Sequence, residues 1–324
     1  MTETQQDMPQ QRLMHFPITF FAIVMGLSGL TLAFHAAASL FPAFEQITVL
    51  TLWFTTLVFA AISLLYLAKL VKHKDQVKGE WNHPVRLAFF PAISISILLL
   101  ALAWYHQIGD VVRPVFMLGV VAQAILTLSV ISGWVGNRSF QHGHLSPAWF
   151  IPAVGNVLVP LIGVPLGYTD LSWFFFSFGI VFWIVLLTLV VNRLIFHDPL
   201  PGKLQPTLVI LIAPPAIGFV AWALLVGGLD PFGRILVNSA YVFAAIVIVQ
   251  LPRLFTLPFA MSFWALSFPV AALTVASFRY GELGGNAFFT QLGTGLLVVL
   301  TILIAGLLLR TVKAAMAGQV CVPE

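Results

Sequence analysis

Long apolar stretches recur along the chain, and polar residues are confined to short intervals between them. Read with a window of about 20 residues, the length an α-helix needs to cross a bilayer, the sequence contains ten such stretches. They cover residues 17–40, 47–71, 87–106, 111–133, 148–167, 171–196, 206–226, 234–252, 258–279 and 288–310. The pattern predicts an all-α integral membrane protein with ten transmembrane helices.

The intervals between the predicted helices are mostly shorter than about 15 residues, whereas a separate domain needs at least about 50. We therefore expect one transmembrane unit over residues 17–310, with tails over residues 1–16 and 311–324. The first sixteen residues lack the basic start and the cleavage site of a signal peptide, so they are interpreted as a tail.

Composition excludes a soluble enzyme or a nucleic-acid-binding domain. The chain is 60% hydrophobic and only 8% charged, and its mean hydropathy is +1.01, whereas globular chains are about 25% charged. The basic residues are scattered and show no aromatic interleaving, so we expect no nucleic-acid partner. A single cysteine, Cys321, excludes a disulfide framework and a Cys-based metal site, and no motif predicts a catalytic residue or a cofactor.

The basic residues predict the orientation, because Lys and Arg next to membrane spans are retained in the cytoplasm. With a cytoplasmic N-terminus, only Arg113, Arg234 and Arg279 fall outside. The other twelve fall inside: Arg12, Lys69, Lys72, Lys74, Lys78, Arg86, Arg138, Arg193, Lys203, Arg253, Arg310 and Lys313. We expect a multi-pass protein of a bacterial inner membrane with both termini cytoplasmic. The basic 69–86 loop is ordinary positive-inside anchoring or a dock for lipid headgroups or a soluble protein.

Helix-breaking residues recur in every second predicted span, roughly every 55–65 residues, as in a helical-hairpin repeat. The odd-numbered spans contain Gly26 and Gly29; Pro91; Pro152, Pro160 and Pro165; Pro214 and Pro215; and Pro269. Proline removes a helical hydrogen bond, a defect tolerated in lipid only where neighbours or a water-filled cavity satisfy the freed groups. We therefore expect five hairpins whose odd-numbered helices surround a central pore; the alternative is that proline is simply frequent in membrane helices.

Charged residues are absent from the middle of every predicted span, which disfavours a carrier driven by a buried carboxylate. A passive or weakly binding conduit fits better. Histidine is the one redox-capable ligand left, and His35 and His106 fall at similar depth in the first and third spans. They leave open a haem-binding membrane anchor of a quinone-linked oxidoreductase.

Several local sequences occur together in a familiar order. They are Phe21-Ala22-Ile23 and Gly26-Leu27; Glu80-Trp81-Asn82-His83-Pro84-Val85-Arg86; Phe150-Ile151-Pro152-Ala153-Val154; Gly167-Tyr168-Thr169-Asp170-Leu171; Ala213-Pro214; and Phe263-Trp264-Ala265-Leu266-Ser267-Phe268-Pro269. In this order and spacing, over residues 16 to about 310, the chain resembles the tellurite-resistance/dicarboxylate transporter family, TehA-type, which includes the slow-type anion channels of plant guard cells.

The resemblance implies five hairpins around a pore, a homotrimer with one pore per subunit, and transport of small inorganic or organic anions. It also implies that Phe268 plugs the pore. Pro269 is closer to the plant pattern than to the bacterial one, and Ala22 replaces a common glycine. Leu187-Thr188 stands where bacterial members have a Glu-Pro pair. Candidate pore-lining or helix-kink residues are Ala22, Gly26, Gly29, Pro91, Pro152, Pro160, Pro214, Pro215 and Pro269.

An aromatic ring in a narrow apolar constriction blocks ions by excluding water, so Phe268 is the candidate gate. The leading functional hypothesis is a phenylalanine-gated anion channel or exporter. A carrier for C4-dicarboxylates or for sulfite- or tellurite-type oxyanions, and the haem anchor, are the alternatives.

Overall fold

The computed structural model describes residues 12–136 and 140–322, and among these residues it contains helices and no β-strand. Residues 1–11 of the predicted N-terminal tail, and Arg138 of the predicted cytoplasmic set, lie outside the described residues. The expectation of an all-α protein is confirmed.

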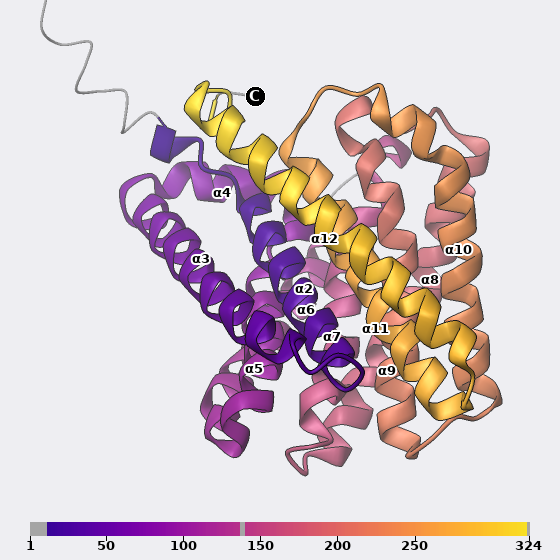
Figure 1. Cartoon of the computed structure of the whole chain (residues 1–324). Coiled ribbons are helices and arrows are strands. Elements are labelled where there is room, and N and C mark those ends of the chain that lie inside the picture. Colours follow the sequence, from indigo (N-terminus) through magenta and orange to yellow (C-terminus); the bar gives the residue numbers. More distant parts are fainter. Residues whose placement is uncertain (1–11, 137–139, 323–324) are drawn as a thin grey trace, which may run out of the picture.

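Ten α-helices of 14 residues or more occur in the described part of the chain (Figure 1). They are α2 (Phe21–Ala38), α3 (Phe44–Lys72), α5 (Ala92–Ile108), α6 (Arg113–Gly136), α7 (Phe150–Gly163), α8 (Thr169–Phe196), α9 (Ala213–Val226), α10 (Pro231–Phe255), α11 (Ser267–Gly284) and α12 (Ala287–Met316). The short helix α4 (Lys74–Asn82) lies between α3 and α5.

In the part of the chain that the structure describes, eight helical segments are long and apolar enough to cross a membrane. One of them, Arg86–Gly136, contains both α5 and α6, and the shorter apolar segment Pro147–Gly163 contains α7. The chain is therefore a multi-pass membrane protein. That each of the ten long helices crosses the bilayer remains a prediction.

The helices form five consecutive hairpins arranged as a closed ring. Each of α2, α5, α7, α9 and α11 packs against the helix that follows it, namely α3, α6, α8, α10 and α12. The same five helices contact one another in sequence, and α11 returns to α2 and closes the circle. This is the predicted architecture, with the odd-numbered spans inside.

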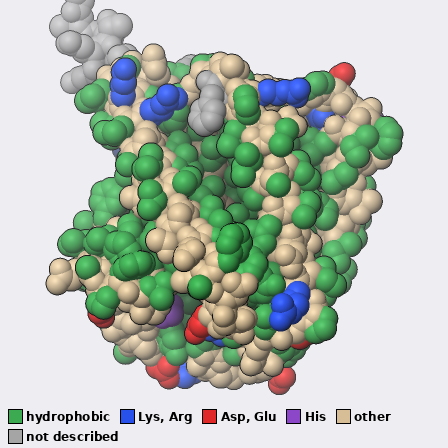
Figure 2. All heavy atoms as spheres, turned by 45° about the vertical axis from the view of Figure 1, so that its right-hand side comes forward, with side chains coloured by type: hydrophobic (Ala, Val, Ile, Leu, Met, Phe, Trp, Pro, Cys, Tyr) green, Lys and Arg blue, Asp and Glu red, His purple; other side chains and the backbone are tan. Residues whose placement is uncertain are grey.

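Burial separates the two rings. Every residue of α7 from Phe150 to Gly163 is buried, whereas most of the large exposed apolar side chains belong to the outer helices α3, α6, α8, α10 and α12. Such side chains would be costly in water but are at no disadvantage against lipid tails. Hydrophobic side chains likewise cover the band between the two ends of the molecule in Figure 2.

The helix breakers lie elsewhere than expected. Each inner α-helix is preceded by a 3₁₀ segment: η1 (Ile18–Phe20), η2 (Arg86–Phe89), η5 (Pro147–Trp149), η6 (Gly202–Ile212) and η7 (Met261–Leu266). Pro91 directly precedes α5, and Pro152, Pro214, Pro215 and Pro269 lie in the first turns of α7, α9 and α11. The first turn of an α-helix has no intrahelical acceptor for its N–H groups, so proline costs little there. The expectation that these five prolines bend helix interiors is corrected, and of the predicted prolines Pro160 lies inside an α-helix.

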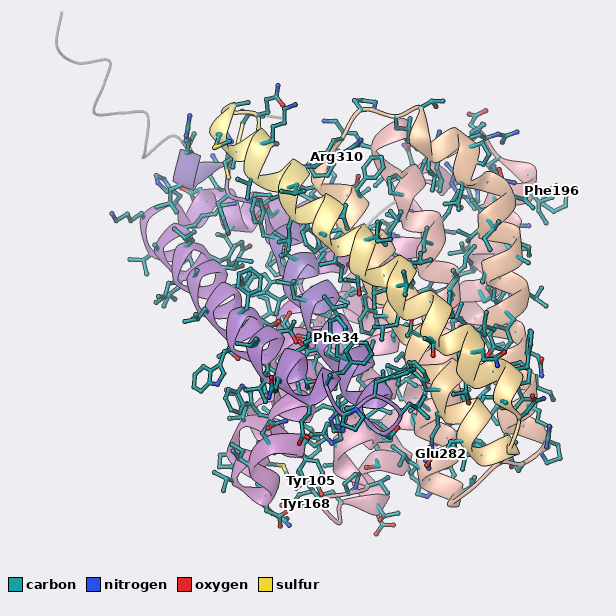
Figure 3. All side chains as sticks on the ribbon, in the orientation of Figure 1. Phe34, Tyr105, Tyr168, Phe196, Glu282 and Arg310 are labelled. Carbon is teal, nitrogen blue, oxygen red and sulfur yellow. The ribbon has the colours of Figure 1, made fainter. Side chains whose placement is uncertain are left out.

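The two ends of the ring differ. The N-terminal ends of the inner helices, residue 12 and the last turn of α12 share one end, here called the terminal end (Figure 1). The turns after α2, α5, α7, α9 and α11 form the opposite end. Figure 3 shows Arg310 towards the terminal end and Tyr105, Tyr168 and Glu282 at the opposite end.

Candidate functional site

A cavity of about 300 Å³ lies within the ring of inner helices, towards the opposite end. All five inner segments contribute to its wall, for example through Gly29, Leu99, Pro165, Ile217 and Phe268. Most of its lining is apolar. We call it the smaller cavity.

A second cavity, of about 660 Å³, opens at the terminal end and is called the larger cavity. Its wall is built from the 3₁₀ segments and the loops before them, and includes Thr19, Ala22, Phe89 and Ala265. Residues 319–322, which follow α12, also line it. The cavities thus lie at opposite ends of the inner helices, one in the 3₁₀ layer and one in the α-helical layer.

Phe268 lies in the wall of the smaller cavity. It is the second residue of α11, it is 6% exposed, and it lines the smaller cavity. Ala265, three residues earlier in the chain, lines the larger cavity. The junction of η7 and α11 therefore contributes to the walls of both cavities.

The glycines of α2 allow this helix to approach α11 closely. A Cβ added at Gly26 would lie 2.2 Å from Oγ of Ser267, and one at Gly29 would lie 2.6 Å from Cβ of Ala271. The Gly29 methyl would also lie 3.6 Å from Cδ2 of Phe268. Both glycines serve helix contact within a continuous α2, so they do not bend it.

The other predicted residues divide by position. Ala22 lines the larger cavity and Gly29 the smaller one. The candidates that line neither cavity are Gly26, Pro91, Pro152, Pro160, Pro214, Pro215 and Pro269. Thr188, in the pair that replaces the bacterial Glu-Pro, is exposed on α8 and is thus far from the ring's interior.

Among the described charged residues that line each cavity, Lys and Arg outnumber Asp and Glu. Lys69, Arg86 and Lys203 line the larger one together with a single acid, Glu80, so its formal charge is +2 (three minus one). Arg279 is the charged residue that lines the smaller cavity, and no acid is among its described lining residues. The larger cavity therefore presents a potential that favours anions over cations, whereas Arg279 of the smaller one is paired with Glu282 at 2.7 Å.

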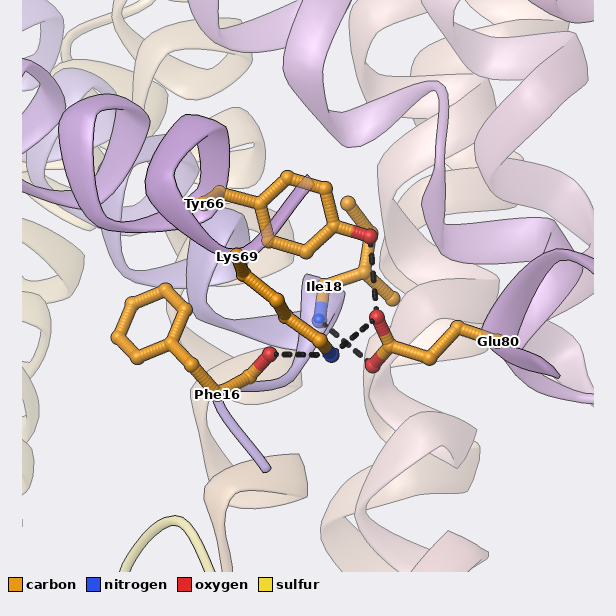
Figure 4. A network of polar contacts seen from close by, with 5 residues as sticks. All are labelled: Phe16, Ile18, Tyr66, Lys69 and Glu80. Atoms are coloured by element: carbon orange, nitrogen blue, oxygen red, sulfur yellow. Dashed lines mark hydrogen bonds and ion pairs between the residues drawn. The ribbon is translucent and has the colours of Figure 1, made fainter. Parts of the chain in front are cut away.

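A buried polar network in the wall of the larger cavity was not predicted from the sequence. Nζ of Lys69 donates hydrogen bonds to Oε2 of Glu80 and to the carbonyl oxygen of Phe16, each at 2.8 Å (Figure 4). The Tyr66 hydroxyl donates to the same carboxylate at 3.0 Å, and the Ile18 N–H donates to Oε1 at 3.2 Å. Lys69 and Glu80 are 2% and 3% exposed. Helices α3 and α4 thus hold the start of η1, and the basic 69–86 loop is partly an internal structural element.

The haem alternative is contradicted by the geometry of its two candidate ligands. The rings of His35 and His106 are stacked, with centroids 3.8 Å apart and an interplanar angle of 25°. Two axial ligands would have to approach the iron from opposite faces of a porphyrin, and rings in direct contact leave no room for the macrocycle. Within residues 12–136 and 140–322, no group of three or more His, Cys, Asp or Glu could hold a metal ion.

Comparisons with known proteins agree with this arrangement. The model of a family described as SLAC1, voltage-dependent anion channel, matches residues 15–312. The S-type anion channel SLAH2 of Arabidopsis thaliana is 28% identical over 83% of this chain, which spans about half (53%) of that relative's length. An uncharacterized transporter of Methanocaldococcus jannaschii is 28% identical over 94% of the chain and 95% of its own length. A tellurite resistance protein TehA homolog of Haemophilus influenzae is 26% identical over 88% of the chain and 90% of its own length.

Proposed function

Because the chain belongs to the SLAC1 family of voltage-dependent anion channels, we propose that it conducts small anions across a bacterial inner membrane along the axis of its inner ring. The observation that carries the proposal is the pair of basic-lined cavities on that axis, one at each end of the inner helices. The terminal end faces the cytoplasm in this proposal. No step of transport requires a catalytic residue or a cofactor.

Phe268 is the gate in this proposal. Its ring is nearly fully buried and lines the smaller cavity, whose wall is mostly apolar. An ion cannot cross such a segment without shedding its hydration shell, so the ring blocks conduction by dewetting. A change of its rotamer opens the passage.

The few basic side chains in the cavity walls give only a loose preference among anions. With one arginine, two histidines and otherwise apolar side chains, the smaller cavity cannot replace the hydration shell of a strongly hydrated ion. We therefore expect large, easily dehydrated monovalent anions to pass best. An inside-negative membrane potential contributes about 2.3 kcal/mol per charge per 100 mV to outward movement of an anion, so the pore exports.

The test replaces the gate and a matched phenylalanine on the same helix. Phe268→Ala should raise the anion conductance of proteoliposomes several-fold over the parent protein, because the constriction becomes wettable. Phe278→Ala is the control: Phe278 is also 6% exposed, but its ring faces outward against α12, where it packs at Gly293. Equal conductance of the Phe268→Ala variant and the parent, both purified and folded, would reject the gate.

The same recordings decide between a channel and an oxyanion carrier. The name of the Haemophilus influenzae relative makes tellurite a suitable member of the anion panel, beside sulfite, a C4-dicarboxylate, nitrate and chloride. A channel gives current proportional to voltage, whereas a carrier gives saturable, proton-linked uptake. A homotrimer is part of the proposal, and native mass spectrometry of the detergent-solubilised protein tests it.

A further inference from the structure

The stacked histidines belong to the smaller cavity. His35, near the end of α2, and His106, near the end of α5, both line it together with Arg279 of α11. These are the charged or titratable groups among the described lining residues, and all three are positive when protonated. They come from three of the five inner helices, so they converge on one mouth of the passage.

We propose that this mouth is a proton-strengthened binding site for a small monovalent anion, formed by His35, His106 and Arg279. The proposal rests on the anion pathway proposed above and adds a regulator to it, the pH of the solution at the opposite end of the ring. A cavity of about 300 Å³ holds a partly hydrated monovalent ion, since a water molecule occupies about 30 Å³.

The stack links proton binding to anion binding. Two neutral imidazoles lie in contact at 3.8 Å without electrostatic cost, whereas two imidazolium ions at that separation repel each other. An anion between this pair and Arg279 offsets the repulsion. Proton uptake therefore strengthens anion binding, and by reciprocity anion binding promotes proton uptake.

Other charged groups near the site do not reverse the expected direction of its pH dependence. Glu45, in the first turn of α3, acts electrostatically on His35 but is exposed. Glu282 is 68% exposed and pairs with Arg279 at 2.7 Å. Asp110, beyond the end of α5, pairs with Arg113, and Tyr105 lies edge-on to His106. The lining residues of α7 and α9 are apolar, so no titratable group faces the pair from those helices.

The experiment measures anion binding separately from conduction. Broadening of the ³⁵Cl⁻ NMR line by purified protein in detergent reports bound chloride whether or not the pore conducts. The titration runs from about pH 8 to about pH 5, because the ordinary pKa of histidine, ~6.5, lies inside this range and that of glutamate, ~4.3, lies below it. We expect chloride affinity to rise at least roughly threefold across this window, because protonation adds one positive charge close to the bound anion.

Three variant proteins test the assignment. The doubly substituted His35→Gln, His106→Gln protein should bind chloride weakly and independently of pH. Arg279→Gln should weaken binding at every pH but keep the rise on acidification. His142→Gln is the matched control, because His142 is also stacked, on His197 with centroids 4.3 Å apart, but lines neither cavity. Its chloride binding should follow the parent.

The outcomes separate this inference from the proposed function. A rise in affinity that persists in the double variant, or that is absent from the folded parent, overturns the histidine site. Failure of Phe268→Ala to conduct any anion, with chloride binding and its pH dependence intact, rejects the channel and leaves the binding site standing. In conducting Phe268→Ala liposomes, acid on the side of this mouth alone should lower the chloride concentration that gives half-maximal current.

Discussion

The Lys69–Glu80 pair is buried beside the start of η1, just before α2. A charge taken out of water without a partner costs several kcal/mol, and here each charge has its partner and further hydrogen bonds. The carboxylate of Glu80 accepts from three donors, so its capacity is largely filled. The pair is thus a structural joint between α3, α4 and the start of η1.

Lys69→Met should lower the free energy of unfolding by about 3–5 kcal/mol, because it leaves the Glu80 carboxylate buried without its counter-charge. Tyr66→Phe removes one neutral donor and should cost about 1–2 kcal/mol. Denaturation in detergent, followed by tryptophan fluorescence, measures both. The Lys69→Met, Glu80→Gln double variant should recover part of the loss. A double variant as unstable as the sum of its single substitutions would show that the two side chains do not interact.

Cys321 reports on the wall of the larger cavity, because it is the single cysteine and lies in the segment after α12 that lines this cavity. Burial raises the pKa of its thiol, and the nearby Lys69 and Arg12 oppose this shift. A raised pKa means less thiolate at a given pH than in a free cysteine. A methanethiosulfonate reagent should therefore react more slowly with the native protein than with the unfolded protein at about pH 7.5, and the two rates should converge as pH rises. Equal rates at about pH 7.5 would place the thiol in open solvent.

At the scale of the helices, the sequence predicts the hairpins well and their internal structure poorly. An apolar stretch of about 20 residues reports how much of the chain avoids water, but the same stretch can be α-helix or 3₁₀ helix. The stretch at 206–226 consists of the end of η6 and the whole of α9, and that at 258–279 contains η7 and most of α11. Proline placement marks these junctions, but a proline in the first turn of a helix and one in its middle look alike in sequence until the start of the helix is known.

The contact between α2 and α11 gives an element-scale prediction. Gly26→Ala puts a methyl group 2.2 Å from Oγ of Ser267, whose own hydroxyl is tied to the Trp264 carbonyl at 2.6 Å, so the helices must move apart. We expect a loss of about 1–3 kcal/mol in unfolding free energy, as for other overpacked sites. Gly306→Ala in α12 is the control, because nothing lies within 4 Å of the added methyl. It should leave stability unchanged or raise it slightly, since alanine favours helix. Similar melting of the two variants would mean that the close packing is relieved without cost.

At the scale of the whole molecule, part of the site could likewise be predicted from the sequence and part could not. The order of breakers predicts the ring, and the resemblance points to Phe268, which the fold places in the wall of the smaller cavity. The histidine stack and the Lys69–Glu80 pair depend on contacts between residues 71 and 11 positions apart, and no local pattern encodes such contacts. Matched depth of His35 and His106 was visible in the sequence, but their direct contact was not.

The unequal charge of the two ends predicts how the whole molecule sits in its membrane. Eleven of the twelve Lys and Arg residues predicted to be cytoplasmic lie at or near helix ends on the terminal side: Arg12, Lys69, Lys72, Lys74, Lys78, Arg86, Arg193, Lys203, Arg253, Arg310 and Lys313. The opposite end has Arg113, Arg234 and Arg279 against five acids, Glu45, Asp110, Asp170, Asp230 and Glu282. Since basic residues near helix ends stay in the cytoplasm, the terminal end should face inward and the histidine mouth outward.

A green fluorescent protein fused after Glu324 should fluoresce, and alkaline phosphatase at the same position should be inactive. The same pair of reporters inserted after Gly228, in the turn between α9 and α10, should give the reverse result. Active phosphatase at the C-terminus would show that the molecule has the opposite orientation, with the proton-sensitive mouth facing the cytoplasm.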